Sequence, residues 1–205
     1  MDALLKQKRL LPLYTVKDIE DCIPIGHCLV QADLPIIEVA FRSDKAQAGI
    51  RELKKVPGLF VGAGTVKTME ELDQAIQAGA DFIVSPGSDL AVIRACMEHQ
   101  IPIYPGIVTP SEILASYTKG IRCFKFFPAA SYGGIATLKA LHGPFPDITF
   151  LPTGGVDESN YLEYLQLDYV LAVGGSFILP SDLLKCKDYI GLENHIARLL
   201  HRKEL

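Results

Sequence analysis

The sequence alternates between short apolar segments and longer amphipathic segments from residue 11 to its end. The apolar segments have the length of strands, whereas the amphipathic segments repeat apolar residues at helical spacing, as in residues 68–78. Regular alternation of this kind predicts parallel strands joined by helices. Eight strands are predicted, and they begin near Leu11, Pro35, Leu59, Asp81, Ile101, Ile121, Ile148 and Tyr169.

The residues that follow these strands favour a closed barrel over an open sheet. An open sheet binds ligands mainly at its switch point, so it needs functional residues after only one or two strands. Here nearly every predicted strand ends in polar or glycine-rich sequence. These ends are Glu38 with Arg42, GAGT at 62–65, SPG at 85–87, Lys125, TGG at 153–155 and GGS at 174–176. Because a (β/α)8 barrel (TIM barrel) gathers all eight strand ends around one mouth, we predict that α/β fold.

The length and composition are those of one globular core. The chain has 205 residues, of which 49% are hydrophobic and 21% are charged. We therefore expect residues 1–205 to form a single barrel domain. Residues 1–10 are expected to form a short helix at the bottom of the barrel, and residues 188–201 the final helix.

Charge and cysteine content narrow the partners and the compartment. The net charge is -4, and no basic stripe suggests a nucleic-acid partner. Apolar stretches such as 169–179 are too short and too interrupted by glycine to cross a membrane, and the N-terminal segment has no signal-peptide pattern. The five cysteines form no CxxC pair, which favours reduced thiols. We expect a cytoplasmic protein.

Metal chemistry is not expected. The five histidines fall in predicted helices or at helix ends, and none stands with a carboxylate at the spacing of metal ligands. The sequence therefore predicts no metal site and no cofactor. It points instead to an organic carbonyl compound that a lysine activates.

Lys125 is the candidate for that lysine. It lies within IRCFKFFP at 121–128, a predicted strand rich in aromatic residues. Burial among such neighbours favours the neutral amine, which is a nucleophile toward carbonyl carbon. The alternative is a structural lysine at a strand end, with its stem buried and its ammonium in water.

Glu38 is the candidate acid–base group. In PIIEVAFR at 35–42, alternation places Glu38 and Arg42 on the face that looks into the barrel. An inward carboxylate needs a partner or a chemical role, and an ion pair with Lys125 or Arg42 would satisfy it structurally. Four residues of strand span roughly 13 Å, so Arg42 is expected at the rim, where it could hold an anionic group.

Two glycine pairs late in the chain indicate a phosphate site. Gly154–Gly155 follows the seventh predicted strand, and Gly174–Gly175 with Ser176 follows the eighth. Barrels commonly bind phosphate at these two strand ends through backbone N–H groups. The alternative is two tight turns without a ligand.

An ordered set of motifs resembles one enzyme family. The motifs are EVAFR, GAGTV, SPG, PGIVTPSE, KFFPA, LHGPFP, PTGGV and VGGSF, and the similarity runs over residues 11–180. They resemble the 2-keto-3-deoxy-6-phosphogluconate (KDPG) aldolases, many of which also cleave 4-hydroxy-2-oxoglutarate (KHG). The resemblance implies a class I (Schiff-base) aldolase of TIM-barrel fold that assembles as a homotrimer and binds a small keto acid.

The resemblance also implies residue roles. Lys125 is similar to the Schiff-base lysine, and Glu38 to the acid–base glutamate. Residues similar to the family's substrate-binding and apolar lining residues are Arg42, Thr65, Pro86, Phe127 and Thr153. Residues similar to the family's phosphate pocket are Gly154, Gly155, Gly175 and Ser176.

Other functions stay open at the level of sequence. KHG, or a keto acid of galactonate configuration, could be the main aldolase substrate. A phosphate-binding isomerase or epimerase would transfer protons between two carboxylates or a carboxylate and a histidine, and the sequence shows no second inward carboxylate. A non-catalytic binding barrel would give no reason for Lys125 and Glu38 to face each other.

Overall fold

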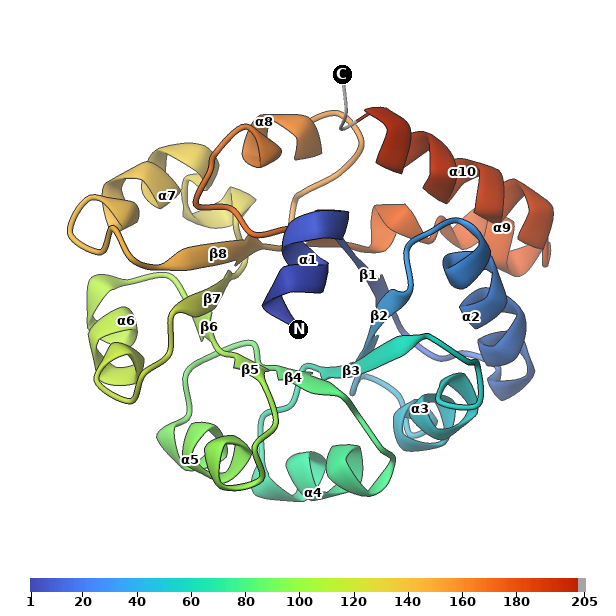
Figure 1. The fold of residues 1–205 in the computed structure, drawn as a ribbon, viewed down its shortest axis with the longest axis horizontal. Helices are drawn as coiled ribbons and strands as arrows, with labels where there is room; N and C mark the ends of the chain where they lie inside the picture. Colours follow the sequence, from blue (N-terminus) through green and yellow to red (C-terminus); the bar gives the residue numbers. More distant parts are fainter. Residues whose placement is uncertain (203–205) are drawn as a thin grey trace.

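A computed structural model describes residues 1–202, and within them parallel strands close into a barrel (Figure 1). One run of paired strands has the order β5-β4-β3-β2-β1-β9, and a second has the order β6-β7-β8. Bridges between Phe150 and Val170 and between Thr153 and Gly174 join β8 to β9. The strands are β1 (Leu10–Tyr14), β2 (Ile36–Ala40), β3 (Phe60–Gly64), β4 (Phe82–Val84), β5 (Ile103–Tyr104), β6 (Gly106–Ile107), β7 (Cys123–Phe126), β8 (Thr149–Pro152) and β9 (Val173–Gly175). The predicted (β/α)8 barrel is confirmed.

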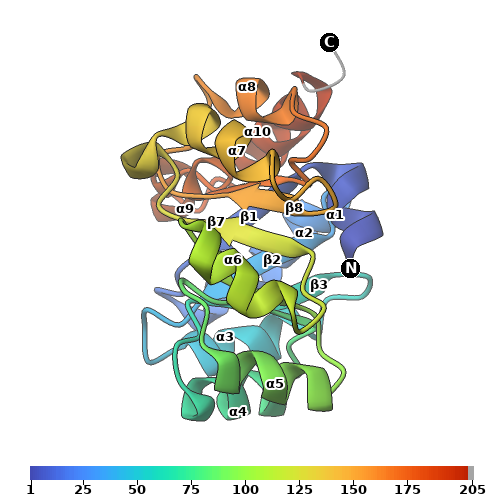
Figure 2. The same ribbon diagram turned by 90° about the vertical axis from the view of Figure 1, so that its left-hand side faces the viewer.

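Helices surround the barrel and cover the outer faces of its strands (Figures 1 and 2). Their apolar residues pack against the strands in a continuous core. The helices are α1 (Asp2–Lys8), α2 (Cys22–Gln31), α3 (Ala46–Leu53), α4 (Met69–Gln77), α5 (Leu90–Glu98), α6 (Pro110–Tyr117), α7 (Gly134–His142), α8 (Tyr161–Leu165), α9 (Ser181–Lys185) and α10 (Tyr189–Arg202).

The helix α1 lies across the axis of the barrel, beside the beginnings of the strands (Figure 1). Its residue Leu5 is fully buried, and the Tyr104 hydroxyl on β5 donates a hydrogen bond of 2.6 Å to Asp2 Oδ1. Arg9 ends the helix in the left-handed region and donates to the carbonyls of Leu165 and Val170. The N-terminal segment therefore closes the bottom of the barrel and leaves the opposite mouth for ligands.

The elements differ from the predicted ones at two places. The fifth strand is divided into β5 and β6 at Pro105, because proline has no N–H to donate to a ladder. The eighth strand starts at Val173 instead of near Tyr169, because in this segment only Val170 forms a bridge to β8. The predicted helix at 68–78 corresponds to α4, with Thr68 as its N-cap and Gly79 in the left-handed region after it.

Candidate active site

The strands β2 and β7 bring Glu38 and Lys125 together across the interior of the barrel. Lys125 Nζ lies 3.3 Å from Glu38 Oε1. The side chains are 3% and 1% exposed, respectively, so the pair is almost completely removed from water. The predicted pairing of the two residues is therefore present, whereas a surface lysine with its ammonium in water is not.

A glycine on the neighbouring strand makes room for the Glu38 carboxyl group. Gly62 is the register partner of Glu38 on β3, and Gly106 on β6 is the partner of Lys125. Gly64, two residues beyond Gly62, lies so close to Glu38 that any side chain there would overlap the carboxyl group. In the sequence, GAGT was identified only as a strand end, and this role of Gly64 was missed. The signal was its parity, since positions 62 and 64 face inward together.

One oxygen of the Glu38 carboxylate is unpaired within residues 1–202. Glu38 Oε2 is buried and has no hydrogen-bond partner among the residues that the structure describes. A buried carboxylate oxygen normally has such a partner, so this one is available to a water molecule or to a substrate hydroxyl. The Phe127 ring, with its centroid 5.2 Å from Lys125 Nζ, forms part of the apolar wall.

The remaining residues predicted for the keto-acid site lie where other strands end. Arg42 is exposed in the turn after β2, and Pro86 is half-buried after β4. Thr153 is buried directly after β8 and bridges to Gly174. Thr65, after β3, has a φ of 61°, which is unfavourable for a β-branched residue. Such backbone strain is often kept at functional sites, so it supports the predicted role of Thr65 at the end of β3.

The two predicted phosphate-binding segments lie side by side at the ends of β8 and β9. Gly154 and Gly155 have φ values of 87° and 77°, and their N–H groups donate no hydrogen bond within residues 1–202. Gly175 has an extended backbone with a φ of -177°, so its conformation does not require glycine. Ser176 is exposed and begins a short 3-10 helix. The first pair therefore has the geometry of an anion site, and the second segment contributes the neighbouring wall.

The surroundings of Lys125 and Glu38 favour the neutral form of the neighbouring thiol. Burial raises the pKa of the Cys123 thiol, two residues before Lys125 on β7, to about 12. Within residues 1–202, no group of three histidine, cysteine, aspartate or glutamate side chains could hold a metal ion. Over the same residues, no helix has the length and apolar character needed to span a membrane.

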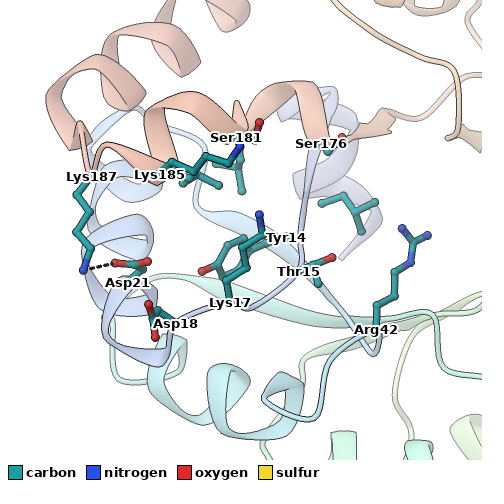
Figure 3. Close-up of a pocket in the computed structure, with 13 residues that line it drawn as sticks. Tyr14, Thr15, Lys17, Asp18, Asp21, Arg42, Ser176, Ser181, Lys185 and Lys187 are labelled. Carbon is teal, nitrogen blue, oxygen red and sulfur yellow. Dashed lines mark ion pairs between the residues drawn. The ribbon is translucent and has the colours of Figure 1, made fainter.

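Arg42 and Ser176 also line a cleft of about 350 Å³ between the loop after β1 and the segment after β9 (Figure 3). Neither Lys125 nor Glu38 lines it. The cleft therefore adjoins the predicted site without containing its two central residues.

A buried lysine held against a carboxylate inside a (β/α)8 barrel, with free backbone donors at Gly154 and Gly155 after β8, is the arrangement of a class I aldolase. A family model described as KDPG and KHG aldolase matches residues 1–195. The KHG/KDPG aldolase of Escherichia coli strain K12 is 40% identical over 189 residues, which is 92% of this chain and 89% of that protein.

Solved structures agree with this similarity. A KDPG aldolase from Legionella pneumophila, with pyruvate captured at low pH as a covalent carbinolamine intermediate, superposes with a TM-score of 0.92 at 35% identity over 96% of each chain. A KDPG aldolase from Zymomonas mobilis ZM4, with 3-phosphoglycerate, has a TM-score of 0.89 at 33% identity over 96% of this chain and 94% of that one. The chain belongs to the KDPG and KHG aldolase family.

Proposed function

We propose that this aldolase cleaves KDPG to pyruvate and glyceraldehyde 3-phosphate through a Schiff base on Lys125. The observation that carries the proposal is the buried contact of 3.3 Å between Lys125 Nζ and Glu38 Oε1. The covalent carbinolamine of pyruvate in the Legionella pneumophila relative supports a lysine-bound route. The proposed catalytic unit is the whole chain, folded as one barrel domain.

The first half of the reaction forms the covalent intermediate. The neutral amine of Lys125 attacks the C2 ketone and gives a carbinolamine, and loss of water then gives a protonated imine. In the apolar wall around β7, water has little access to this intermediate, which favours its formation. The positive charge on the imine nitrogen lies beside the Glu38 carboxylate and is stabilised by it.

The second half breaks the carbon–carbon bond. Glu38, directly or through a bound water, removes the proton from the C4 hydroxyl, and the C3–C4 electrons move into the imine. Glyceraldehyde 3-phosphate leaves, and an enamine of pyruvate stays on Lys125. Glu38 returns a proton to C3, and hydrolysis of the imine releases pyruvate. The unpartnered Oε2 of Glu38 is the atom proposed to accept and return the proton.

The proposed substrate contacts follow from position around the mouth. Arg42 and Thr65 hold the pyruvate carboxylate, Pro86 and Phe127 form the apolar wall, and Thr153 contacts the hydroxyl-bearing carbons. The phosphate is bound by backbone N–H groups and a hydroxyl of the neighbouring segments. These are Gly154, Gly155, Gly175 and Ser176. The free N–H groups at 154 and 155 support this placement, and 3-phosphoglycerate in the Zymomonas mobilis relative supports a phosphorylated ligand.

KHG is the second candidate substrate, because the Escherichia coli relative is named for both compounds. KHG carries a carboxylate where KDPG continues into the phosphorylated carbons. The same lysine and glutamate would cleave it to pyruvate and glyoxylate. A keto acid of galactonate configuration would require a different arrangement of hydroxyl contacts around Thr153.

Borohydride trapping tests the covalent step. Pyruvate with borohydride should attach a reduced adduct to Lys125, located by peptide mass mapping, and Lys125→Met should abolish it. An adduct on another lysine, or none at all, would exclude this mechanism.

Substrate preference tests the phosphate site. KDPG should exceed its unphosphorylated analogue in kcat/KM by at least about 10²-fold, because several charge-assisted hydrogen bonds are lost with the phosphate. Ser176→Asp should remove that preference by repelling the dianion, and it should leave KHG cleavage nearly unchanged. Equal use of both six-carbon substrates by the wild type would make KHG the first candidate.

We also propose that the enzyme is a cytoplasmic homotrimer. A homotrimer would give a mass three times the 22.4 kDa of one chain in light scattering. Leu90 and Met97 of α5 and Leu114 of α6 are exposed apolar residues that such an interface could cover. All five cysteines are free thiols, which supports a cytoplasmic enzyme.

A further inference from the structure

The cleft beside the aldolase site has two opposite walls. One wall is the loop after β1, with Thr15 and Lys17, and the other is the segment after β9, with Ser181 and Lys185. The walls meet because β9 and β1 are paired as neighbours in the barrel. Figure 3 shows the side chain of Lys17 extending from the first wall and that of Lys185 running along the second wall toward Ser181.

The positive charges in this cleft are not neutralised by the protein. Within residues 1–202, the side chains of Lys17, Lys185 and Arg42 make no hydrogen bond or ion pair. All three are exposed to solvent, so an incoming ligand can reach them. Two ammonium groups that line the same small cleft repel one another, and an anion bound there would reduce that repulsion.

The acidic residues of the cleft, in contrast, already have cationic partners. Asp21 Oδ1 lies 3.3 Å from Lys187 Nζ and accepts a hydrogen bond from the Tyr189 hydroxyl. Asp18 Oδ1 lies 3.8 Å from Lys45 Nζ. The cleft thus keeps an excess of positive charge in a chain whose net charge is -4.

The shape and the other lining groups indicate a small ligand. The volume of about 350 Å³ is within the range of small-molecule sites. Leu13, Leu179 and Leu184 line the cleft, and they can cover the carbon atoms of a ligand. Hydroxyl groups of Thr15 and Ser181 are available as donors, since they make no hydrogen bond among the described residues.

We propose that this cleft is a second oxyanion site, separate from Gly154 and Gly155, that binds the phosphate group of a small phosphorylated molecule between Lys17 and Lys185. Even with Arg42 assigned to the pyruvate carboxylate, the two unpaired lysines match a phosphate dianion better than a single carboxylate. The ligand could be the phosphorylated substrate itself, held by its phosphate during entry or product release. It could also be a separate phosphate ester or free phosphate. Only binding of the substrate's own phosphate rests on the proposed function.

Inorganic phosphate is the probe for the site itself. Titration followed by amide NMR should shift the backbone signals of residues 15–17 and 181–187 in the wild type. The double variant Lys17→Gln/Lys185→Gln should lose those shifts. The control Lys119→Gln/Lys139→Gln removes the same charge elsewhere on the surface and should keep them. The inference is overturned if the wild-type signals do not move, or if they move equally in the Lys17/Lys185 variant.

Kinetics distinguish the two sources of phosphate. If the substrate's own phosphate binds here, Lys17→Gln/Lys185→Gln should raise KM for KDPG by at least about 10-fold, with kcat and KHG cleavage nearly unchanged. If a separate molecule binds, KM for KDPG should stay at the wild-type value while the phosphate-induced NMR shifts are lost. Pyruvate trapping at Lys125 shows that the variants are folded. Should trapping fail in the wild type, the proposed function fails, and the NMR result still decides whether the anion site exists.

Discussion

Glu38 occupies the space that a side chain at Gly64 would need. A Cβ atom on Gly64 would overlap Oε1, Cγ and Cδ of Glu38, although the two residues belong to different strands. Because the barrel interior is closely packed, the absence of a side chain at position 64 determines where the carboxylate lies. The contact of 3.3 Å between Glu38 and Lys125 therefore depends on a glycine that bears no functional group.

Gly64→Ala should displace the Glu38 carboxyl group and slow the proton-transfer steps. A shift of about 1 Å can cost about 10²-fold in rate, so we expect kcat to fall by about 10- to 100-fold. Pyruvate trapping at Lys125 should persist. Gly87→Ala is the matched control, because a Cβ there meets no atom within 4 Å and kcat should stay near the wild-type value. A wild-type kcat in Gly64→Ala would show that the enzyme tolerates a displaced carboxylate.

Glu38→Gln should separate imine formation from proton transfer. The amide keeps the shape of the side chain but cannot act as a base, and general acid–base steps contribute about 10²- to 10⁴-fold in rate. The variant should still trap pyruvate slowly with borohydride. It should lose most KDPG cleavage and most exchange of the pyruvate methyl protons with solvent, measured by NMR in D₂O. Near-normal exchange would mean that another group carries the proton.

Strand periodicity contributes to the predicted contact between Glu38 and Lys125, which the structure contains. Alternation along the strand assigns Glu38 to the inward face, the aromatic strand around Lys125 predicts its burial, and closure of the barrel brings the inward faces of β2 and β7 together. The alternation of strands and helices similarly predicted the barrel. These predictions succeeded because they depend on the repeat of regular elements, which one sequence displays directly.

Features that depend on contacts between loops were not predictable in this way. The helix α9, which carries Lys185, has only five residues, so it shows no helical periodicity in the sequence. Its position opposite Lys17 depends on the pairing of β9 with β1, the first and last strands of the chain. The close approach of the Glu38 side chain to Gly64 likewise depends on the tilt of side chains between strands. Such distances arise from tertiary packing, which a pattern in one segment does not contain.

The thiols should differ sharply in reactivity. Burial raises the pKa of Cys22 to about 11 and that of Cys96 and Cys123 to about 12, and it also raises the pKa of Cys28. Cys186 is exposed. Because the thiolate is the reactive form, only Cys186 should react rapidly with a thiol reagent in the folded protein at pH 8.

A thiol reagent that releases a chromophore on reaction checks this prediction, because the absorbance gives the number of reacted cysteines and their rates. Cys186→Ser should remove the fast phase and leave aldolase activity unchanged, whereas all five cysteines should react in denaturant. A fast phase that persists in Cys186→Ser would show that one of the buried segments opens readily.

The capping box of α6 should make stability depend on pH. Glu112 Oε2 accepts hydrogen bonds from the N–H groups of Val108 and Thr109, both at 2.8 Å, while Thr109 caps the helix through the N–H of Glu112. Partial burial opposes ionisation of Glu112, but these hydrogen bonds outweigh it and lower its pKa below the ordinary value. A lowered pKa in the folded state contributes stability above the ordinary pKa, and this contribution is lost as the pH falls through the folded-state value.

Glu112→Gln should therefore lower the free energy of unfolding by about 1 kcal/mol at pH 7, the usual effect of a lost cap. The difference from wild type should shrink as the pH falls below about 4, where the wild-type carboxyl also becomes protonated. Urea unfolding at a series of pH values measures both free energies. Glu20→Gln removes the same charge from an exposed residue outside any capping box. It should change the free energy of unfolding little at every pH of the series. A difference for Glu112→Gln that stays constant as the pH falls from 7 to well below 4 would show that the shape of the side chain, and not its charge, stabilises the start of α6.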